Sequence, residues 1–207
     1  MKKAFALVLA LAMALTLLAC GGTPASSSAP ASGAASASAA SAGTAEGDAE
    51  YAVILKVLAS QYWQTMRDGI EAKAEERGIK VDIYAANTED DVEGQVSLLE
   101  NAISKGYKAI GVAPISDVNL NNAIADATEQ GIKIVNIDEA INMEALTELG
   151  GAVYAYVATD NVKVGQMGAE YLIEQIGGEG EVAIVEGKAG TINGDNRRDG
   201  ATETFEA

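Results

Sequence analysis

A set of residues, most of them polar or aromatic, directly follows four short apolar runs of this chain between residues 51 and 140. They are Lys56, Ser60, Tyr62 and Trp63 after the first run, Asn87 after the second, Ala113, Pro114 and Ser116 after the third, and Asp138 and Glu139 after the fourth. Carboxylate, hydroxyl and ammonium groups hydrogen-bond ligand hydroxyls, and aromatic rings pack on the C–H face of a sugar ring. The set therefore predicts a binding site for a small polyol.

The same residues do not assemble a catalytic centre. The sequence has no histidine, which excludes Ser-His-Asp and Cys-His mechanisms and histidine-ligated zinc. Gly187 and Lys188 resemble the end of a phosphate-binding loop, but Ala189 replaces the required hydroxyl residue and the earlier glycine is missing. The loop after the first apolar run, residues 58–62, contains no glycine, so the dinucleotide fingerprint is absent. We predict that the chain is not an enzyme and needs no cofactor.

An acidic cluster between the second apolar run and the next helix invites a metal-site interpretation. It consists of Glu89, Asp90, Asp91 and Glu93, without the ligand spacing or central glycine of a calcium loop. Acidic residues in a first helical turn complement the helix dipole, and we expect Thr88 to cap this helix with Asp91 three residues on. We predict no metal.

Structural roles compete with binding at some of the candidate positions. Trp63 shares a helix face with Met66 and Ile70, so packing in the core is an almost equal alternative for its ring. Asp138 and Glu139 could instead cap the turn that follows the fourth apolar run. The sequence leaves both alternatives open.

The elements that must position these side chains are predicted from alternating apolar runs and amphipathic stretches, a pattern typical of βαβ units around a parallel sheet. We expect strands over 51–57, 81–84, 109–112, 132–137, 153–159 and 181–185, and helices over 62–77, 91–105, 119–130 and 162–176. Residues 138–151 are expected to be irregular, and a last helix to open near residue 204. Gly78, Gly106 and Gly131 each end a helix. Ligands of such sheets bind at the carboxyl ends of the strands, where the candidate residues lie.

The first fifty residues predict export and attachment to a membrane. Lys2 and Lys3 precede an apolar stretch over 4–19, which has the shape of a secretory signal and is too short to favour a membrane span. The stretch ends in Leu-Leu-Ala-Cys, the pattern of a bacterial lipoprotein signal, and Cys20 is the only cysteine. We expect residues 1–20 to be a lipoprotein signal peptide with lipid on Cys20. An ordinary signal peptide and an uncleaved anchor remain alternatives, and both still export the chain.

Residues 21–50 consist almost entirely of small and polar residues, which predicts a disordered Ser/Ala-rich tether. The protein is then exported and lipid-anchored to the cell membrane, facing the periplasm or the cell exterior. The net charge of −16 repels phosphate backbones, so we expect no nucleic-acid partner. We expect a monomer.

Six segments in order resemble the periplasmic sugar-binding proteins of the ribose type. They are 50–58 (EYAVILKVL), 113–120 (APISDVNL), 134–140 (IVNIDEA), 159–165 (TDNVKVG), 181–190 (EVAIVEGKAG) and 197–205 (RRDGATETF). The resemblance implies a two-lobed α/β fold of the periplasmic-binding-protein type with Rossmann-like parallel sheets. The first lobe would cover residues 51–155, and residues 156–207 would begin a second lobe that is incomplete in this chain.

The resemblance also implies a function: a monosaccharide of the allose or ribose type is captured between the lobes by hinge closure and delivered to an ABC permease. It matches Lys56, Tyr62, Trp63, Asp138 and Glu139 to first-lobe sugar contacts, and Arg197 to a second-lobe contact, with Arg198 as the fallback. The family's Asn-Pro-aromatic-aromatic stretch is Ser60-Gln61-Tyr62-Trp63 here, so the sugar is not identified. Later second-lobe contacts would lie beyond Ala207, and we expect this chain to bind sugar weakly or not at all.

Three other functions remain alternatives. The protein could bind another small neutral ligand and deliver it to a signalling receptor. Repressors of the lactose type share the two-lobed architecture, but they begin with a basic helix-turn-helix segment, whereas this chain begins with a signal sequence. An exported α/β enzyme would need a nucleophile or an acid/base pair, which the sequence does not supply.

Overall fold

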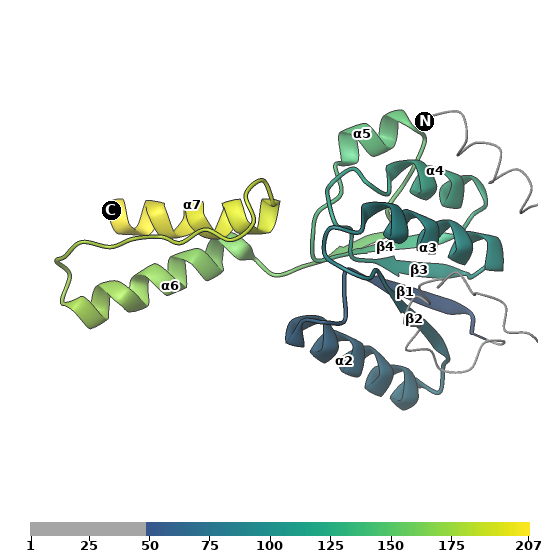
Figure 1. The fold of residues 1–207 in the computed structure, drawn as a ribbon, viewed down its shortest axis with the longest axis horizontal. Helices are drawn as coiled ribbons and strands as arrows, with labels where there is room; N and C mark the ends of the chain where they lie inside the picture. Colours follow the sequence, from purple (N-terminus) through teal and green to yellow (C-terminus); the bar gives the residue numbers. More distant parts are fainter. Residues whose placement is uncertain (1–48) are drawn as a thin grey trace, which may run out of the picture. The chain divides into compact units, whose positions relative to one another are not determined.

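The computed structural model describes residues 49–207, and these belong to a single unit by their contacts. A parallel sheet of five strands in the order β2-β1-β3-β4-β5 forms its centre (Figure 1). The strands are β1 (Tyr51–Leu55), β2 (Val81–Ala85), β3 (Ala109–Val112), β4 (Lys133–Ile137) and β5 (Ala155–Val157). The predicted parallel α/β fold is confirmed. The predicted signal peptide over 1–20, with Cys20, and the tether up to residue 48 lie outside the described residues.

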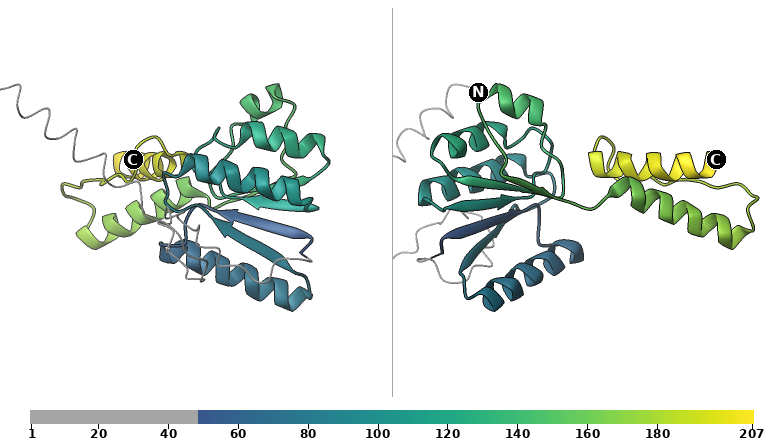
Figure 2. Two further views of the ribbon diagram at one scale, coloured as in Figure 1. Left: turned by 45° about the vertical axis from the view of Figure 1, so that its right-hand side comes forward. Right: turned by 180° about the vertical axis from the view of Figure 1, so that it is seen from behind.

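Four helices flank the sheet, and two more follow it. α2 (Gln61–Arg77) lies on one face, whereas α3 (Val92–Lys105), α4 (Asn121–Glu129) and α5 (Met143–Glu148) lie on the other (Figures 1 and 2). After β5 the chain forms α6 (Asn161–Ile176) and α7 (Ile192–Glu206). Within residues 49–207, none of the helices has the length and apolar character that a membrane crossing requires.

The two faces of the sheet follow from the period-two alternation of β1. Ala52 and Ile54 enter the larger core cluster, which α3, α4 and α5 cover, whereas Leu55 enters a smaller cluster with Trp63 on the side of α2. Successive side chains of a strand point to opposite faces, so one strand supplies both cores. The carboxyl ends of these strands therefore present their following loops from a sheet that is packed on both faces.

Glycine ends α2 and α3 as predicted. Gly78 and Gly106 adopt the left-handed conformation with φ of 63° and 76°, and each donates its N–H back to the preceding turn. Only glycine adopts this conformation at little cost. Gly131 is also left-handed, at φ 78°, but it follows the C-cap Gln130 of α4 by one position.

The prediction that Thr88 caps α3 is wrong, because Asp91 does so. The Asp91 carboxylate accepts hydrogen bonds from the backbone N–H of Gly94 at 3.0 Å and from the Asn87 side chain at 2.9 Å. Helix α3 begins at Val92, so the third helical N–H lies within reach of Asp91, whereas Thr88 is a full turn too early. These bonds, with that from the Asn87 side chain the largest, lower the pKa of Asp91.

Two further predictions about the region after β4 are corrected. Residues 138–151 are not irregular throughout, because α5 forms there, with the Asn142 side chain accepting from Ala145 N–H at 3.0 Å and Leu146 buried beneath it. A helix of six residues is too short to show a helical period. The strand predicted over 153–159 is shorter, and it pairs with β4, so the sheet extends to Val157, past the expected lobe boundary at residue 155.

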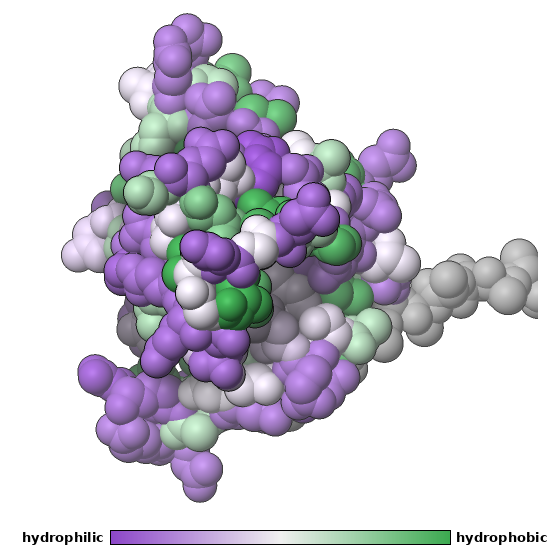
Figure 3. Space-filling model, turned by 90° about the vertical axis from the view of Figure 1, so that its left-hand side faces the viewer, coloured by the Kyte–Doolittle hydropathy of each residue, from purple (hydrophilic) through white to green (hydrophobic). Residues whose placement is uncertain are grey.

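The strand predicted over residues 181–185 does not form, although these residues are described in the structure. A strand needs a neighbour that accepts and donates its ladder hydrogen bonds, and no described strand pairs with these residues. Val182, Ile184 and Val185 are exposed instead. Figure 3, viewed from the side on which α6 and α7 lie, shows hydrophobic side chains near the centre of a largely hydrophilic face. The last helix begins at Ile192, well before residue 204.

Helices α6 and α7 lie side by side in contact (Figure 2). A Cβ added to Gly165 of α6 would lie 2.1 Å from the carbonyl oxygen of Arg197, and one added to Gly200 of α7 would lie 2.2 Å from that of Val162. Two glycines thus allow the helix backbones to approach this closely. The contact fixes the part of α7 that carries Arg197.

Candidate functional site

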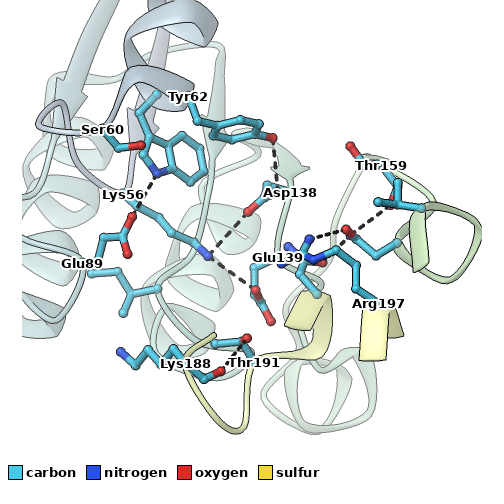
Figure 4. Close-up of a pocket in the computed structure, with 15 residues that line it drawn as sticks. Lys56, Ser60, Tyr62, Glu89, Asp138, Glu139, Thr159, Lys188, Thr191 and Arg197 are labelled. Atoms are coloured by element: carbon cyan, nitrogen blue, oxygen red, sulfur yellow. Dashed lines mark hydrogen bonds and ion pairs between the residues drawn. The ribbon is translucent and has the colours of Figure 1, made fainter. Parts of the chain in front are cut away.

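A pocket of about 480 Å³ opens at the carboxyl ends of the strands (Figure 4). Its volume lies in the range of small-molecule sites. It is lined by Lys56, Ser60, Tyr62, Trp63, Glu89, Ile115, Asp138, Glu139, Thr159, Asn161, Val164, Lys188, Thr191, Asn193 and Arg197. All seven residues that the sequence predicts for sugar binding line this one pocket, and their role in binding stays a prediction.

Lys56 and the two carboxylates come from the ends of β1 and β4. The Lys56 ammonium lies 3.5 Å from Asp138 Oδ2 and 3.4 Å from Glu139 Oε2, and these side chains are 12%, 14% and 4% exposed respectively. Figure 4 shows the ammonium pointing at both carboxylates. Buried charges are costly unless they are paired, so this cluster holds its three groups in fixed places.

The backbone at Asp138 is in a conformation that aims its side chain into the pocket. Asp138 has a φ of 66°, the only positive value among the described residues other than glycine. Its N–H donates to Val157 O at 2.9 Å, and its own carbonyl accepts from the Tyr156 hydroxyl at 3.0 Å. Strained backbone of this kind persists only where the surroundings hold it, and it concentrates at functional sites. Strand β5 therefore positions the Asp138 carboxylate.

Glu139 makes contacts with three parts of the chain. Oε2 receives Lys56, and Oε1 accepts the backbone N–H of Ile192 at 2.9 Å. The backbone carbonyl of Glu139 accepts a hydrogen bond from the buried Asn136 side-chain amide at 2.7 Å. The side-chain oxygen Oδ1 of Asn136 accepts in turn from Ile141 N–H at 3.1 Å. The backbone and the carboxylate of Glu139 are both fixed.

Trp63 packs in the core and also lines the pocket, and a role of its ring in binding stays a prediction. Its side chain is 4% exposed and packs in the core cluster with Leu55 and Ile83, yet it also lines the pocket. Its indole N–H donates to Glu89 at 3.4 Å, and the Tyr62 ring meets it edge-to-face with centroids 4.9 Å apart. Core packing therefore orients an aromatic surface toward the pocket.

Two tyrosines stay protonated beside the carboxylates. The Tyr62 hydroxyl donates to Asp138 Oδ1 at 3.4 Å. Burial first, then the charge of Asp138 and this hydrogen bond, raise the pKa of Tyr62, and the nearby Arg197 charge opposes the increase. Burial and the charges of Asp138 and Glu139 raise the pKa of Tyr156 in the same way. Both phenols thus remain donors well above neutral pH.

The structure distinguishes the two adjacent arginines. Arg197 lines the pocket and donates to the Asn161 side chain, which itself donates to Asn193 Oδ1 at 2.9 Å. Arg198 instead pairs with Asp195 at 3.0 Å and Asp199 at 2.7 Å on the surface. Arg197 therefore lines the pocket and Arg198 is not among its lining residues, while the role of either arginine in binding stays a prediction.

Sequence reasoning missed several lining residues, including Glu89, Asn161, Lys188, Thr191 and Asn193. It treated Glu89 only as helix-terminal charge and tested Lys188 only as part of a phosphate loop. The position of Asn161, soon after the last strand, is the one signal that could have identified it.

Four residues after the second and third apolar runs are not among those that line the pocket. Asn87 bonds Asp91, and Ser116 accepts from Asn119 N–H at 3.2 Å in a local turn. Ala113 and Pro114 are buried.

The charges of the lining residues cancel. Three cationic side chains, Lys56, Lys188 and Arg197, face three anionic ones, Glu89, Asp138 and Glu139. Strong donors and acceptors without a net charge suit an uncharged ligand rich in hydroxyl groups. Within the part of the chain that the structure describes, no group of three or more His, Cys, Asp or Glu residues could hold a metal ion.

Comparison with known proteins gives a consistent result. The model of the periplasmic binding protein domain matches residues 51–207. The D-allose-binding periplasmic protein of Escherichia coli K12 is 50% identical over 158 residues, which are 76% of this chain and 51% of that protein. The ribose import binding protein RbsB of Bacillus subtilis is 32% identical over 68% of this chain and 44% of its own length. These relatives are binding proteins, in agreement with the prediction that this chain is not an enzyme.

A solved structure shows the same fold. The periplasmic solute binding protein of an ABC transporter from Actinobacillus succinogenes, with bound D-allose, superposes with a TM-score of 0.73 at 34% identity, over 77% of this chain and 55% of that one. The chain spans about half the length of the curated relatives it matches.

Proposed function

The chain belongs to the periplasmic binding protein family, and we propose that its pocket binds a neutral monosaccharide of the allose or ribose type. The observation that carries the proposal is the buried Lys56–Asp138–Glu139 cluster, which faces Arg197 and two aromatic rings in a pocket of balanced charge. The similarity to a D-allose-binding protein and to a D-allose-bound structure supports the choice of sugar.

The side chains divide the work of recognition by chemistry. The Asp138 carboxylate and the Lys56 ammonium supply an acceptor and donors to vicinal hydroxyls, and Arg197 supplies a planar donor from α7. Tyr62 and Trp63 offer ring surface to the C–H face of the sugar. Ser60 lines the pocket at the N-cap of α2, and its side chain makes no cap hydrogen bond, so its hydroxyl is available to a ligand.

We further propose that residues 51–157 form the first lobe and that α6 and α7 begin the second. The strands that pair in one sheet end at Val157, and α6 begins at Asn161. The short segment between them is then a hinge, and closure brings Arg197 against a sugar held by the first lobe. In the proposed role the closed protein delivers its sugar to an ABC permease, as the description of a relative as an import protein suggests.

The single tryptophan makes a direct test possible. Trp63 is the only tryptophan of the chain and it lines the pocket, so intrinsic fluorescence reports on this site alone. We would titrate D-allose, D-ribose and other aldoses into the chain and fit the fluorescence change. A saturable response to one or a few sugars is expected, in the millimolar range (about −4 kcal/mol), since the chain spans only about half the length of its relatives. Half-saturation at micromolar sugar or below would contradict the expected weakness.

The alternatives give different outcomes in the same assay. Saturation by a nucleoside or a small peptide, with no response to any aldose, would replace the sugar by another neutral ligand. A flat response to all of these compounds, with a folded protein by circular dichroism, would reject the pocket as the binding site. Delivery to a permease is tested separately, by sugar uptake in cells that carry the gene or lack it.

A further inference from the structure

Glu139 lies between two cavities and has no carboxylate oxygen without a protein partner. It lines the main pocket and also a neighbouring cavity of about 240 Å³. Its side chain is 4% exposed, with one oxygen bound to Lys56 and the other to the backbone N–H of Ile192. Both oxygens of Asp138 have partners too, but these partners are the side chains of Lys56 and of the exposed Tyr62, and neither is a backbone N–H. The two adjacent acids therefore have different surroundings.

The contact with Ile192 replaces a missing helix cap. Thr191 occupies the N-cap position of α7, but its side chain makes no cap hydrogen bond and its hydroxyl donates to Lys188 O at 3.0 Å instead. The first N–H groups of a helix have no partner within the helix. Here a carboxylate from the end of β4 accepts one of them, and its negative charge also suits the positive end of the helix dipole.

We propose that Glu139 is a positioning residue, which ties Lys56 to the first turn of α7 and so sets the place of Arg197, and that it is not itself the acceptor of a sugar hydroxyl. The inference rests on the proposed function and assigns one residue of that site a different role. Ile192 and Arg197 stand on the same helix, separated by five residues, or about 7.5 Å of helical rise. Over this short stretch of helix, a shift of the first turn also moves the Arg197 guanidinium.

A second contact, in the loop before α7, also joins this region to the rest of the chain, but we expect it to contribute less to the position of α7. Lys188 forms an ion pair with Asp90, and their side chains are 57% and 80% exposed. Exposed pairs contribute little because water and salt screen them, whereas a buried carboxylate that loses a partner leaves that partner unsatisfied. The buried bond of Glu139 is therefore expected to dominate.

The first test requires no ligand. Hydrogen exchange at the Ile192 amide would be compared in the wild-type chain, Glu139→Ala, Glu139→Gln and the control Glu148→Ala, which removes an exposed acid of α5. Loss of the acceptor is expected to speed exchange at Ile192 by about tenfold or more in Glu139→Ala. Glutamine retains one acceptor for two donors, so an intermediate rate is expected. Wild-type exchange in a folded Glu139→Ala variant would overturn the proposal.

The second test separates positioning from direct contact with sugar. Trp63 fluorescence would give the affinity of each variant for D-allose and for each of its monodeoxy analogues. If Glu139 acts by positioning Arg197, Glu139→Ala should weaken D-allose by about tenfold or more, and its losses across the deoxy analogues should follow those of Arg197→Met. A loss that vanishes for one deoxy analogue in Glu139→Ala but persists for the same analogue in Arg197→Met would identify Glu139 as the direct acceptor of that hydroxyl and overturn the proposal.

A double variant measures how far the effects of Glu139 and Arg197 on sugar affinity depend on each other. If Glu139 acts through Arg197, then Glu139→Ala should add little to Arg197→Met, because residues that act as a unit are not additive. Full additivity of the two losses would count against the proposal. A wild-type chain without any sugar response would reject the proposed function, while the exchange rates at Ile192 would still decide the linkage between Glu139 and α7.

Discussion

Arg197 and Arg198 are adjacent in sequence and differ in surroundings, which makes them a matched pair for substitution. Arg197 lines the pocket, whereas the half-buried Arg198 forms ion pairs with Asp195 and Asp199. We predict that Arg197→Met weakens monosaccharide binding by about tenfold or more, since charge-assisted hydrogen bonds contribute about 1.5–3 kcal/mol. Arg198→Met should change the affinity by less than about twofold. Fluorescence titration of Trp63 measures both, and a larger loss in Arg198→Met would contradict the assignment.

A cluster of two phenols around a buried carboxylate predicts a specific response to alkaline pH. Tyr107 donates to the buried Asp82, and its hydroxyl lies 2.8 Å from that of Tyr84. Burial first, then the hydrogen bonds to Asp82 and Tyr84, raise the pKa of Tyr107. Its proton therefore stabilises the fold fully below the unfolded pKa of about 10, and this stabilisation is lost as pH rises above that value.

The corresponding measurement is urea unfolding across alkaline pH. Tyr107→Phe should be less stable than the wild-type chain at neutral pH, because Asp82 loses a donor, and should lose less stability above pH ~10. Tyr171→Phe changes an exposed tyrosine of α6 and is the control. An equal alkaline loss in Tyr107→Phe and the wild-type chain would show that Tyr107 is not responsible.

At the residue scale, the sequence predicted types of group better than their partners. Lys56, Asp138 and Arg197 line one pocket. The sequence could predict them because periodicity and resemblance locate the strand ends and the helix that carry them. The φ of 66° at Asp138 and the bond from Ile192 to Glu139 depend on β5 and α7, which lie far along the chain. No local pattern encodes contacts of that kind. Glu89 and Lys188 were missed for the same reason.

At the element scale, the close packing of α6 on α7 predicts opposite effects for two similar substitutions. A Cβ at Gly165 would lie 2.1 Å from Arg197 O, whereas a Cβ at Gly168, also in α6, would meet nothing within 4 Å. We predict that Gly165→Ala destabilises the chain by about 1–3 kcal/mol because the helices must separate. Gly168→Ala should stabilise it by roughly 0.5–1 kcal/mol, since alanine favours a helix interior. Urea unfolding measures both, and equal effects would reject the packing argument.

Sequence periodicity predicted most of the strands and longer helices well. Strand β3 forms over the predicted residues, and β1, β2 and β4 and the helices α2, α3 and α6 fall within two residues of the predicted bounds. Periodicity failed where packing could not complete the pattern: α5 is too short to show a period, and the apolar residues near 182–185 have no described strand beside them. Side-chain pattern gives propensity, and only a neighbour turns it into a strand.

At the scale of the whole molecule, we propose that lipid on Cys20 holds the protein at the membrane, as the leader and tether predict. The prediction concerns residues outside the described part of the structure. Lipid chains stabilise attachment by about 0.8 kcal/mol for each buried CH₂ group, and stable anchoring takes more than one chain. Expressed in a bacterial host, the wild-type protein should partition into a detergent phase. Cys20→Ser should move to the aqueous phase, and Ser26→Ala, within the tether, should behave as wild type.

Mass spectrometry of the same samples separates the three explanations of the leader. A lipoprotein gains lipid mass on Cys20 and loses residues 1–19. An ordinary signal peptide leaves a protein without lipid, in the aqueous phase whether or not Cys20 is present. An uncleaved anchor retains residues 1–19 and remains in the detergent phase in Cys20→Ser, because the apolar stretch and not the thiol then holds the membrane. Only the first pattern makes the attachment depend on a single sulfur atom, that of Cys20.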